Sequence, residues 1–321
     1  MISKTSRNGP DASLNKLSVR TQSLPTLHQR KRTGWIIYNM KITRMRVIQL
    51  RSSRHSYVII FVVSLVTIIF VFRSKLHEDT HSDILLKERN DLSHRLNDIL
   101  RLYGQQHCEL LKMKMEDSRV SQRGGWCWSM SSPDSQEHKW DKGLWWSSCF
   151  AYALSSFLKG KTVGSFGDGP GAYKSYLDSL GEVRNYTAYD GAPYIEDVTK
   201  GLVKFLDLTS PQYDVPIFDW VLSIEVGEHI PPQYEDTYLD NLARHAREGL
   251  ILSWASPGQN GLSHVNTKPL ADVVLQMNRR GFTLNVKAGE LLRNASTFYW
   301  LRNNVNVYYR ASITSLDELR A

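Results

Sequence analysis

Hydrophobic residues follow three different patterns along the chain. The first is an unbroken apolar run over residues 57–72, which carries no charge and is bounded by Arg54 and Arg73. As a helix this run would extend about 24 Å at 1.5 Å per residue, close to the thickness of a thin bilayer. A buried core helix is the alternative, but a β-branched run without a polar face favours lipid. We therefore predict a transmembrane signal anchor over residues 55–73.

The second pattern is a charged segment in which apolar residues recur at heptad spacing. Its a and d positions hold Leu92, Leu96, Ile99 and Tyr103. The spacing predicts a helical stem over residues 74–118, and a homodimer through this stem is the partner it suggests. Two heptads are too few to establish a coiled coil.

The third pattern begins near residue 145, where short apolar runs alternate with amphipathic stretches. The apolar runs predict strands over residues 162–166, 185–189, 202–206, 220–224, 249–254, 282–286 and 305–309. Helices are predicted over residues 144–158, 173–180, 194–200, 233–246 and 268–279. This alternation indicates an α/β fold, namely a Rossmann-like, doubly wound, mostly parallel seven-stranded sheet with an antiparallel last strand. The domain is placed at residues 145–312, before a short tail over 313–321.

Charge is distributed unevenly along the chain. Residues 1–54 contain twelve Lys or Arg against one acid, Asp11, whereas the remainder carries 28 bases and 31 acids. The folded part therefore gives no reason to expect a nucleic-acid partner. The positive-inside rule makes residues 1–54 a disordered cytosolic tail and the chain a single-pass type II membrane protein of the Golgi or endoplasmic reticulum, with its domain in the lumen. The sequons at Asn185 and Asn294 lie on that side.

A Trp-rich segment over residues 119–144 precedes the domain. Packing is the default explanation for such aromatic residues. The functional alternative is a segment that covers an acceptor, with His138 and Trp140 as candidate substrate-binding residues.

Three cysteines are present in the chain, Cys108, Cys127 and Cys149. In an oxidising lumen Cys127 and Cys149 would close a loop and leave Cys108 for an intermolecular bond. The alternative is three separate thiols.

Candidate ligand-binding residues come at the ends of the predicted strands, where open α/β sheets bind their ligands. The first strand leads into Gly167-Asp-Gly-Pro-Gly171, whose glycines let the backbone approach a ligand at the start of the next helix. Asp190 ends the second strand, where a carboxylate would accept both hydroxyls of a ribose. Asp207 follows the third strand and would accept from an adenine amino group. Each acid is also compatible with an ordinary exposed loop.

These motifs and the run from Phe218 to Ile230, which contains Glu225-Val-Gly-Glu-His229, resemble the class I methyltransferases that use S-adenosylmethionine. The resemblance is to members acting on small-molecule hydroxyl or amine acceptors and covers about residues 145–310. It implies S-adenosyl-L-methionine as the cofactor, held by Gly167, Asp168, Gly169, Gly171, Asp190, Asp207 and Glu225. The family usually has an acid where this chain has Ser165, and Asp168 would partly replace it. A degenerate, non-catalytic domain is the alternative.

Methyl transfer to a hydroxyl requires alignment and the removal of a proton. His229 after the fourth strand and His264 after the fifth are the candidate catalytic bases, because a neutral imidazole accepts a proton near neutral pH. Packing at a helix start is the alternative for His229. Glu225, Glu228 and Asn266 would orient a base or a substrate or hold a divalent ion. No compact metal motif is visible, so Asn266 is assigned to substrate and no metal is predicted.

Together these features predict an S-adenosylmethionine-dependent methyltransferase that O-methylates a carbohydrate or another small hydroxyl acceptor in the secretory pathway. Two alternatives remain: a non-catalytic, membrane-anchored binding protein, and a cytosol-facing methyltransferase of lipids or proteins.

Overall fold

The computed structural model describes residues 54–114, 120–127 and 146–311; for residues 54–60, 62, 63, 74 and 76–80 it describes the backbone alone. The chain divides into two units, Met1–Val66 and Thr67–Ala321. Among the described residues, no helix has an apolar stretch long enough to cross a membrane. The predicted anchor over residues 55–73 falls within α1 (Arg54–Met113), and its membrane location stays a prediction. The predicted tails, residues 1–54 and 313–321, lie outside the described residues except for Arg54, at which α1 begins.

The domain is built on a seven-stranded sheet in the order β3-β2-β1-β4-β5-β7-β6. The strands are β1 (Thr162–Phe166), β2 (Asn185–Asp190), β3 (Lys204–Phe205), β4 (Phe218–Ser223), β5 (Ala246–Leu252), β6 (Phe282–Leu284) and β7 (Asn306–Arg310). The five strands β1 to β5 pair in parallel, whereas β7 runs antiparallel to both β5 and β6. The predicted Rossmann-like α/β fold with an antiparallel last strand is therefore confirmed.

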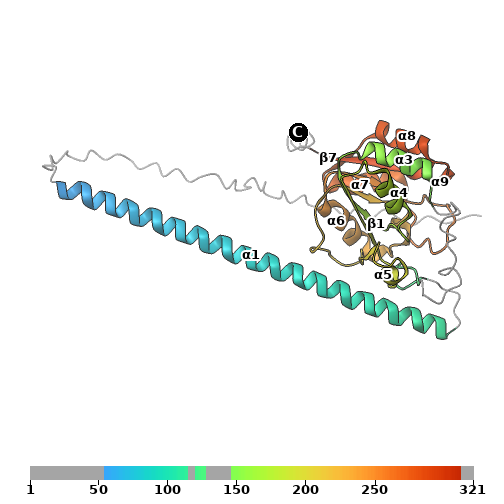
Figure 1. Cartoon of the computed structure of the whole chain (residues 1–321), viewed down its shortest axis with the longest axis horizontal. Coiled ribbons are helices and arrows are strands. Elements are labelled where there is room, and N and C mark those ends of the chain that lie inside the picture. The colour runs from blue at the N-terminus through green and yellow to red at the C-terminus, as the bar shows by residue number, and fades with distance from the viewer. Residues whose placement is uncertain (1–53, 115–119, 128–145, 312–321) are drawn as a thin grey trace, which may run out of the picture. The chain divides into compact units, whose positions relative to one another are not determined.

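Helices cover both faces of this sheet (Figure 1). They are α3 (Ser148–Phe157), α4 (Ala172–Leu180), α5 (Ile195–Val198), α6 (Glu235–His245), α7 (Leu270–Arg279), α8 (Val286–Ala295) and α9 (Tyr299–Asn304). One core joins α3, α4, α5, α8 and α9 to the face that carries Val163 and Trp220. The other joins α6 and α7 to the face that carries Phe166 and Val221. Alternate strand residues thus point to opposite cores, as the pleat of a sheet buried on both faces requires.

Helices α8 and α9 are absent from the sequence-based prediction. The predicted strand over residues 282–286 ends at Leu284, because the Asn285 side chain accepts a hydrogen bond from Ala288 N and caps α8. Similarly, α3 begins after Ser147, whose hydroxyl accepts from Phe150 N. Side-chain capping by Ser147 and Asn285 therefore sets where α3 and α8 begin, and the apolar pattern alone does not show these positions.

The stem helix docks on the domain through polar side chains. Ser93 Oγ accepts from Tyr213 N at 2.9 Å, and Asn97 Oδ1 accepts from Asp207 N at 2.9 Å. Asn97 Nδ2 also donates to Phe205 O, at 3.1 Å. The predicted heptad residues Leu92 and Ile99 stay 65% and 61% exposed, so they do not make this contact. The predicted homodimer stays a prediction.

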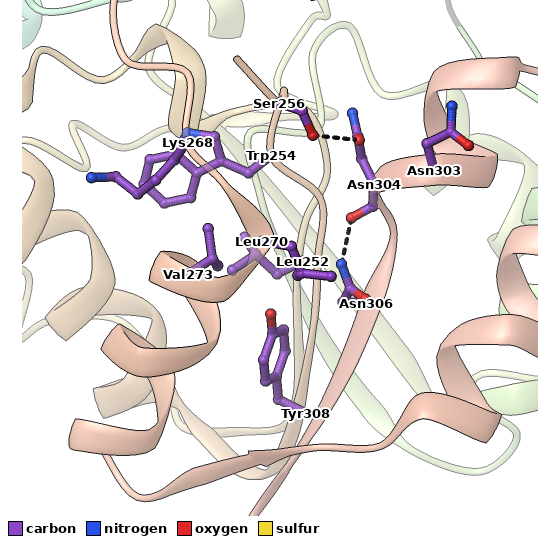
Figure 2. A pocket seen from close by; sticks show the side chains of 10 residues that line it. All are labelled: Leu252, Trp254, Ser256, Lys268, Leu270, Val273, Asn303, Asn304, Asn306 and Tyr308. Carbon is purple, nitrogen blue, oxygen red and sulfur yellow. Dashed lines mark hydrogen bonds between the residues drawn. The ribbon is translucent and has the colours of Figure 1, made fainter.

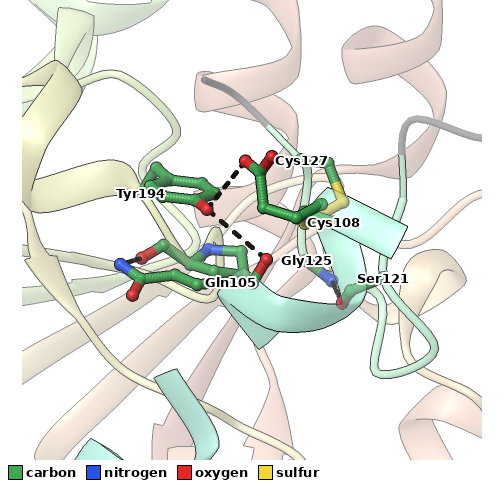
Figure 3. The surroundings of a disulfide bond; sticks show 8 residues. Gln105, Cys108, Ser121, Gly125, Cys127 and Tyr194 are labelled. Carbon is green, nitrogen blue, oxygen red and sulfur yellow. Dashed lines mark hydrogen bonds between the residues drawn. A yellow bond between two sulfur atoms is a disulfide. The ribbon is translucent and has the colours of Figure 1, made fainter. Parts of the chain in front are cut away.

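A disulfide joins the end of the stem to the segment over residues 120–127 (Figure 3). Cys108 pairs with Cys127, with sulfur atoms 2.06 Å apart, so the predicted pairing of Cys127 with Cys149 is wrong. Docking of α1 places buried Cys108 beside the segment, whereas Cys149 is an exposed, free cysteine of α3. Near the bond, Tyr194 OH donates to Gln105 O at 3.4 Å.

Replacing both Cys108 and Cys127 with serine is expected to lower the free energy of unfolding by about 3 kcal/mol. The bond closes a loop with a sequence separation of 19, and losing such a closure restores entropy to the unfolded chain. Urea denaturation of the full-length chain measures the change. Cys149→Ser is the control and should stay within about 0.5 kcal/mol of the wild type. An equal loss in the control would contradict the prediction.

Candidate functional site

The glycine-rich turn lies at the carboxyl end of β1, directly before α4. Gly167, Gly169 and Gly171 have φ angles of 96°, 61° and 87°, in the left-handed region that favours glycine. A Cβ at Gly167 would lie 2.3 Å from Val226 Cγ2, so the turn also passes closely over the segment that follows β4. The predicted cofactor turn therefore needs glycine for both its conformation and its packing.

Asp190 ends β2 beside this turn. Its Oδ2 accepts from Gly169 N and its Oδ1 from Ala192 N, both at 2.9 Å. The side chain stays partly exposed, and burial raises the pKa of its carboxyl. Because each carboxylate oxygen has two lone pairs, Asp190 keeps the capacity to accept further hydrogen bonds from a ligand.

Asp168 points into the protein beneath the turn. Its Oδ1 accepts from Ser165 Oγ and from Tyr186 OH, both at 2.6 Å, and its Oδ2 accepts from Lys174 N at 3.4 Å. The residue is only 8% exposed. Its carboxylate therefore contacts Ser165, the position where the resembling family carries an acid.

Burial raises the pKa of Asp168 to about 6, against the opposing effect of its hydrogen bonds from Ser165 and Tyr186. The folded protein therefore binds a proton at Asp168 more tightly than the unfolded chain does. The proton's contribution to the free energy of unfolding is complete below the unfolded pKa of 3.8 and is lost as pH rises through about 6. Between pH 4 and pH 7 the titration of Asp168 is expected to lower the free energy of unfolding of the wild type by about 3 kcal/mol, and Asp168→Asn should abolish this decrease. Urea melts at each pH measure it. The same pH dependence in wild type and variant would contradict this assignment.

Asp207 binds groups of the chain itself. Its Oδ2 accepts from Arg123 Nε at 2.6 Å, and its Oδ1 accepts from Thr209 N and from Thr209 Oγ1. Arg123 belongs to the disulfide-linked segment over residues 120–127, and no pattern in the sequence predicts its contact with Asp207. The adenine-binding role of Asp207 stays a prediction, and both of its oxygens already have partners in this structure.

Two glutamates follow β4. Glu225 has a φ angle of 55°, which is strained for a non-glycine residue, and Ser253 Oγ accepts from its backbone N at 2.7 Å. Glu228 is fully buried, and neither of its carboxylate oxygens has a hydrogen-bond partner among the described residues. Burial and then the charge of Glu225 raise the pKa of the Glu228 carboxyl well above its usual range. Burial also raises the pKa of Glu225.

The predicted bases His229 and His264 lie together beside Glu228. Their ring centroids are 5.1 Å apart, and His264 Nε2 lies 4.0 Å from Glu228 Oε1. His229 Nδ1 is 3.2 Å from Ser263 O, and His264 Nδ1 is 3.1 Å from Gln259 O. A carbonyl oxygen only accepts, so each Nδ1 carries the proton and each Nε2 keeps a lone pair. Burial, with the charge of His264, lowers the pKa of His229 to about 4.

Glu228, His229 and His264 can each offer one ligand atom, and these atoms lie within 4.8 Å of one another. From the sequence, Glu228 was grouped with Glu225 and Asn266 as a possible ion site, the two histidines were candidate bases, and no metal was predicted. The signal that could have combined them is a Glu-His pair directly after one strand and a His in the loop after the next strand.

Asn266, predicted to bind substrate, is 8% exposed. Its side-chain Nδ2 donates to Glu235 Oε2 at 3.0 Å, and its backbone carbonyl oxygen accepts from Trp254 Nε1 at 2.5 Å. It therefore braces the loop that carries His264. Of the other predicted substrate residues, His138 and Trp140 lie outside the described part of the chain.

A separate pocket opens between α7 and the ends of β5 and β7 (Figure 2). Its lining comprises Leu252, Trp254, Ser256, Lys268, Leu270, Val273, Asn303, Asn304, Asn306 and Tyr308. It includes none of the predicted site residues. Trp254 connects it to the glutamates, because a Cβ at Gly227 would lie 2.4 Å from the Trp254 ring.

The disulfide-linked segment lies over the histidines. The Trp126 ring centroid is 6.1 Å from that of His229, and a Cβ at Gly124 would lie 2.5 Å from His229 O. A Cβ at Gly125 would similarly lie 2.1 Å from Gly191 O. The segment therefore contacts the residues that follow β2 and β4, and Trp126 also packs against the core. The acceptor-covering role of the Trp-rich segment stays a prediction.

Solved structures that resemble this chain include three methyltransferases. Magnesium protoporphyrin IX methyltransferase from Synechocystis, solved with bound SAH, shares 17% identity over 51% of this chain and 81% of that chain, with a TM-score of 0.38. A TehB-like SAM-dependent methyltransferase from Corynebacterium glutamicum shares 15% over 51% and 88%, with a TM-score of 0.39. The N-methyltransferase NodS from Bradyrhizobium japonicum shares 12% over 51% and 94%, with a TM-score of 0.39. No family model and no curated protein matches the sequence.

Proposed function

We propose that this chain is an S-adenosylmethionine-dependent methyltransferase that O-methylates a carbohydrate or another small hydroxyl acceptor. The proposal rests on the residues that meet at the carboxyl ends of β1, β2 and β4. There the glycine turn after β1 and Asp190 after β2 lie beside the Glu225–His229 segment after β4. Ligands of open α/β sheets bind at this edge, where the strand order reverses.

The residues present fit the cofactor. The three left-handed glycines keep side chains off the turn, and a partly exposed carboxylate lies next to it. Gly167 to Gly171 would hold the amino-acid end of the cofactor, and Asp190 would accept from its ribose hydroxyls. When bound, S-adenosylmethionine supplies an electrophilic methyl group, which the acceptor oxygen bonds as the carbon–sulfur bond breaks and its electron pair stays on sulfur.

This chain's own contribution is to orient the acceptor and to receive its proton. His264 presents Nε2 with a lone pair, because its Nδ1 is held by Gln259 O. A Cβ at Gly261 would lie 2.0 Å from this Nε2, so glycine there permits the ring position. The Trp126 ring packs edge-on against the neighbouring His229.

The proposed location is the lumen of the Golgi or endoplasmic reticulum, with residues 55–73 as a type II membrane anchor. Supporting it are the charge difference across this segment and the exposed apolar side chains of Phe61, Phe70 and Phe72, at 69%, 72% and 76%. The disulfide also fits an oxidising compartment. A homodimer through the stem is proposed on the exposed heptad residues.

A labelled-methyl transfer assay tests the function. The full-length chain is incubated with methyl-labelled S-adenosylmethionine and with pools of glycans, lipids and peptides. We expect label in the glycan pool, at an alkali-stable ether. Label in lipids or peptides alone would contradict the acceptor class. Absence of cofactor binding in calorimetry would support a non-catalytic domain instead.

A further inference from the structure

Three potential metal ligands meet at the carboxyl ends of neighbouring strands. Glu228 and His229 belong to the helical turn over Gly227–His229 after β4, and His264 belongs to the loop after β5. One ligand atom from each lies within 4.8 Å of the other two, a spacing that one cation can bridge.

Glu228 is the observation that calls for a ligand. The residue is 0% exposed, and both carboxylate oxygens lack a hydrogen-bond partner among the described residues. Buried carboxylates are normally hydrogen-bonded, paired with a base or bound to a metal. A cation between Glu228 and the imidazoles would satisfy the carboxylate.

Both imidazoles are oriented as metal ligands usually are. His229 Nδ1 donates to Ser263 O at 3.2 Å, and His264 Nδ1 donates to Gln259 O at 3.1 Å. Such hydrogen bonds to the outer nitrogen fix the tautomer and aim the lone pair of the inner nitrogen at the ion. Glu225 Oε1, also buried without a partner among the described residues, is a further candidate ligand.

We propose that Glu228, His229 and His264 bind a divalent first-row transition-metal ion. Two imidazoles and a carboxylate favour such ions over Ca²⁺ or Mg²⁺, which prefer oxygen ligands throughout. Three protein ligands leave coordination positions open. If the proposed function holds, an open position would bind the acceptor hydroxyl and lower its pKa, and the histidines would act as ligands in place of bases.

Metal binding by the chelator-treated, full-length chain tests this site. Titration with Mn²⁺ in a calorimeter should show one ion per chain, and Co²⁺ should give visible absorption bands of a nitrogen- and oxygen-ligated centre. Glu228→Gln should weaken binding by at least 30-fold, and His264→Gln by a similar factor. Glu248→Gln is the matched control, because Glu248 pairs with Lys161 at 2.6 Å and should leave binding unchanged.

Thermal melts keep the test informative if a variant is less stable. Mn²⁺ should raise the melting temperature of the wild type and of Glu248→Gln but not that of Glu228→Gln or His264→Gln. No ion bound by the wild type, or equal binding by Glu228→Gln and the wild type, would overturn the site.

Methyl transfer measured in parallel separates the two proposals. Transfer that survives chelation, together with no bound ion, would overturn the metal site and leave the function standing. A bound ion that depends on Glu228, together with no transfer to any pool, would support the metal site and count against the function.

Discussion

Replacing Asp190 with alanine is expected to weaken S-adenosylmethionine binding by about 1,000-fold. The carboxylate lies at the end of β2, where it would accept from two ribose hydroxyls. Each hydrogen bond to a charged group contributes about 2 kcal/mol, and two of them give about 4 kcal/mol, or roughly three powers of ten in the dissociation constant. Calorimetry on the full-length chain measures the affinity.

Asp190 also accepts from Gly169 N and Ala192 N, so its removal loosens the turn as well. Asp190→Asn keeps one acceptor oxygen and should weaken binding by only about 30-fold. Asp272→Ala, which changes an exposed acid at the start of α7, is the control and should bind like the wild type. If Asp190→Ala lowers the melting temperature but binds the cofactor normally, the carboxylate is a brace of the turn and not a ribose ligand.

His264→Ala is expected to lower kcat by about 1,000-fold while cofactor affinity stays within a factor of about three. A positioned proton acceptor contributes a factor of about 10² to 10⁴ to a rate. The side chain lies beside Glu228, after β5, whereas the proposed ribose ligand lies after β2. The rate of labelled-methyl transfer and calorimetry together separate kcat from binding.

His94→Ala provides the matched control for this loss. Its imidazole is 62% exposed on α1, where it contacts Asp98 and Asp214. The variant should transfer methyl groups at the rate of the wild type. A full rate in His264→Ala would exclude His264 as base and as ligand. A matching loss in cofactor affinity would instead indicate that the loop after β5 supports the cofactor side.

The positions of the strands along the chain were predictable because each buried strand is a short apolar run. Thr162–Phe166 appears in the structure with the predicted bounds, and β2 extends the predicted strand by one residue to Asp190. Prediction was poorer where the signal was weak. The third strand pairs only over Lys204–Phe205, and the segment between Val286 and Asn304 forms two helices that had no assigned structure. Side-chain caps such as Asn285 set those bounds.

Residue types at the strand ends were also predictable, but their orientations were not. Asp190 lies beside the glycine turn, whereas Asp168 is held inward by Ser165 and Tyr186. A single carboxylate in a loop has no periodic pattern that shows which side it faces. Its direction depends on hydroxyl donors from other elements.

The sequence by itself determined the parallel α/β sheet, the glycine turn and the acids and histidines at the strand ends, because periodicity and turn chemistry are local. Only the tertiary structure decided which of these groups meet. Arg123 pairs with Asp207 across 84 residues, and Cys108 pairs with Cys127 because the stem docks on the domain. Glu228 and His229, from the turn after β4, meet His264 from the loop after β5. Such contacts depend on how helices and loops pack over the sheet, and no local pattern in the chain encodes that packing.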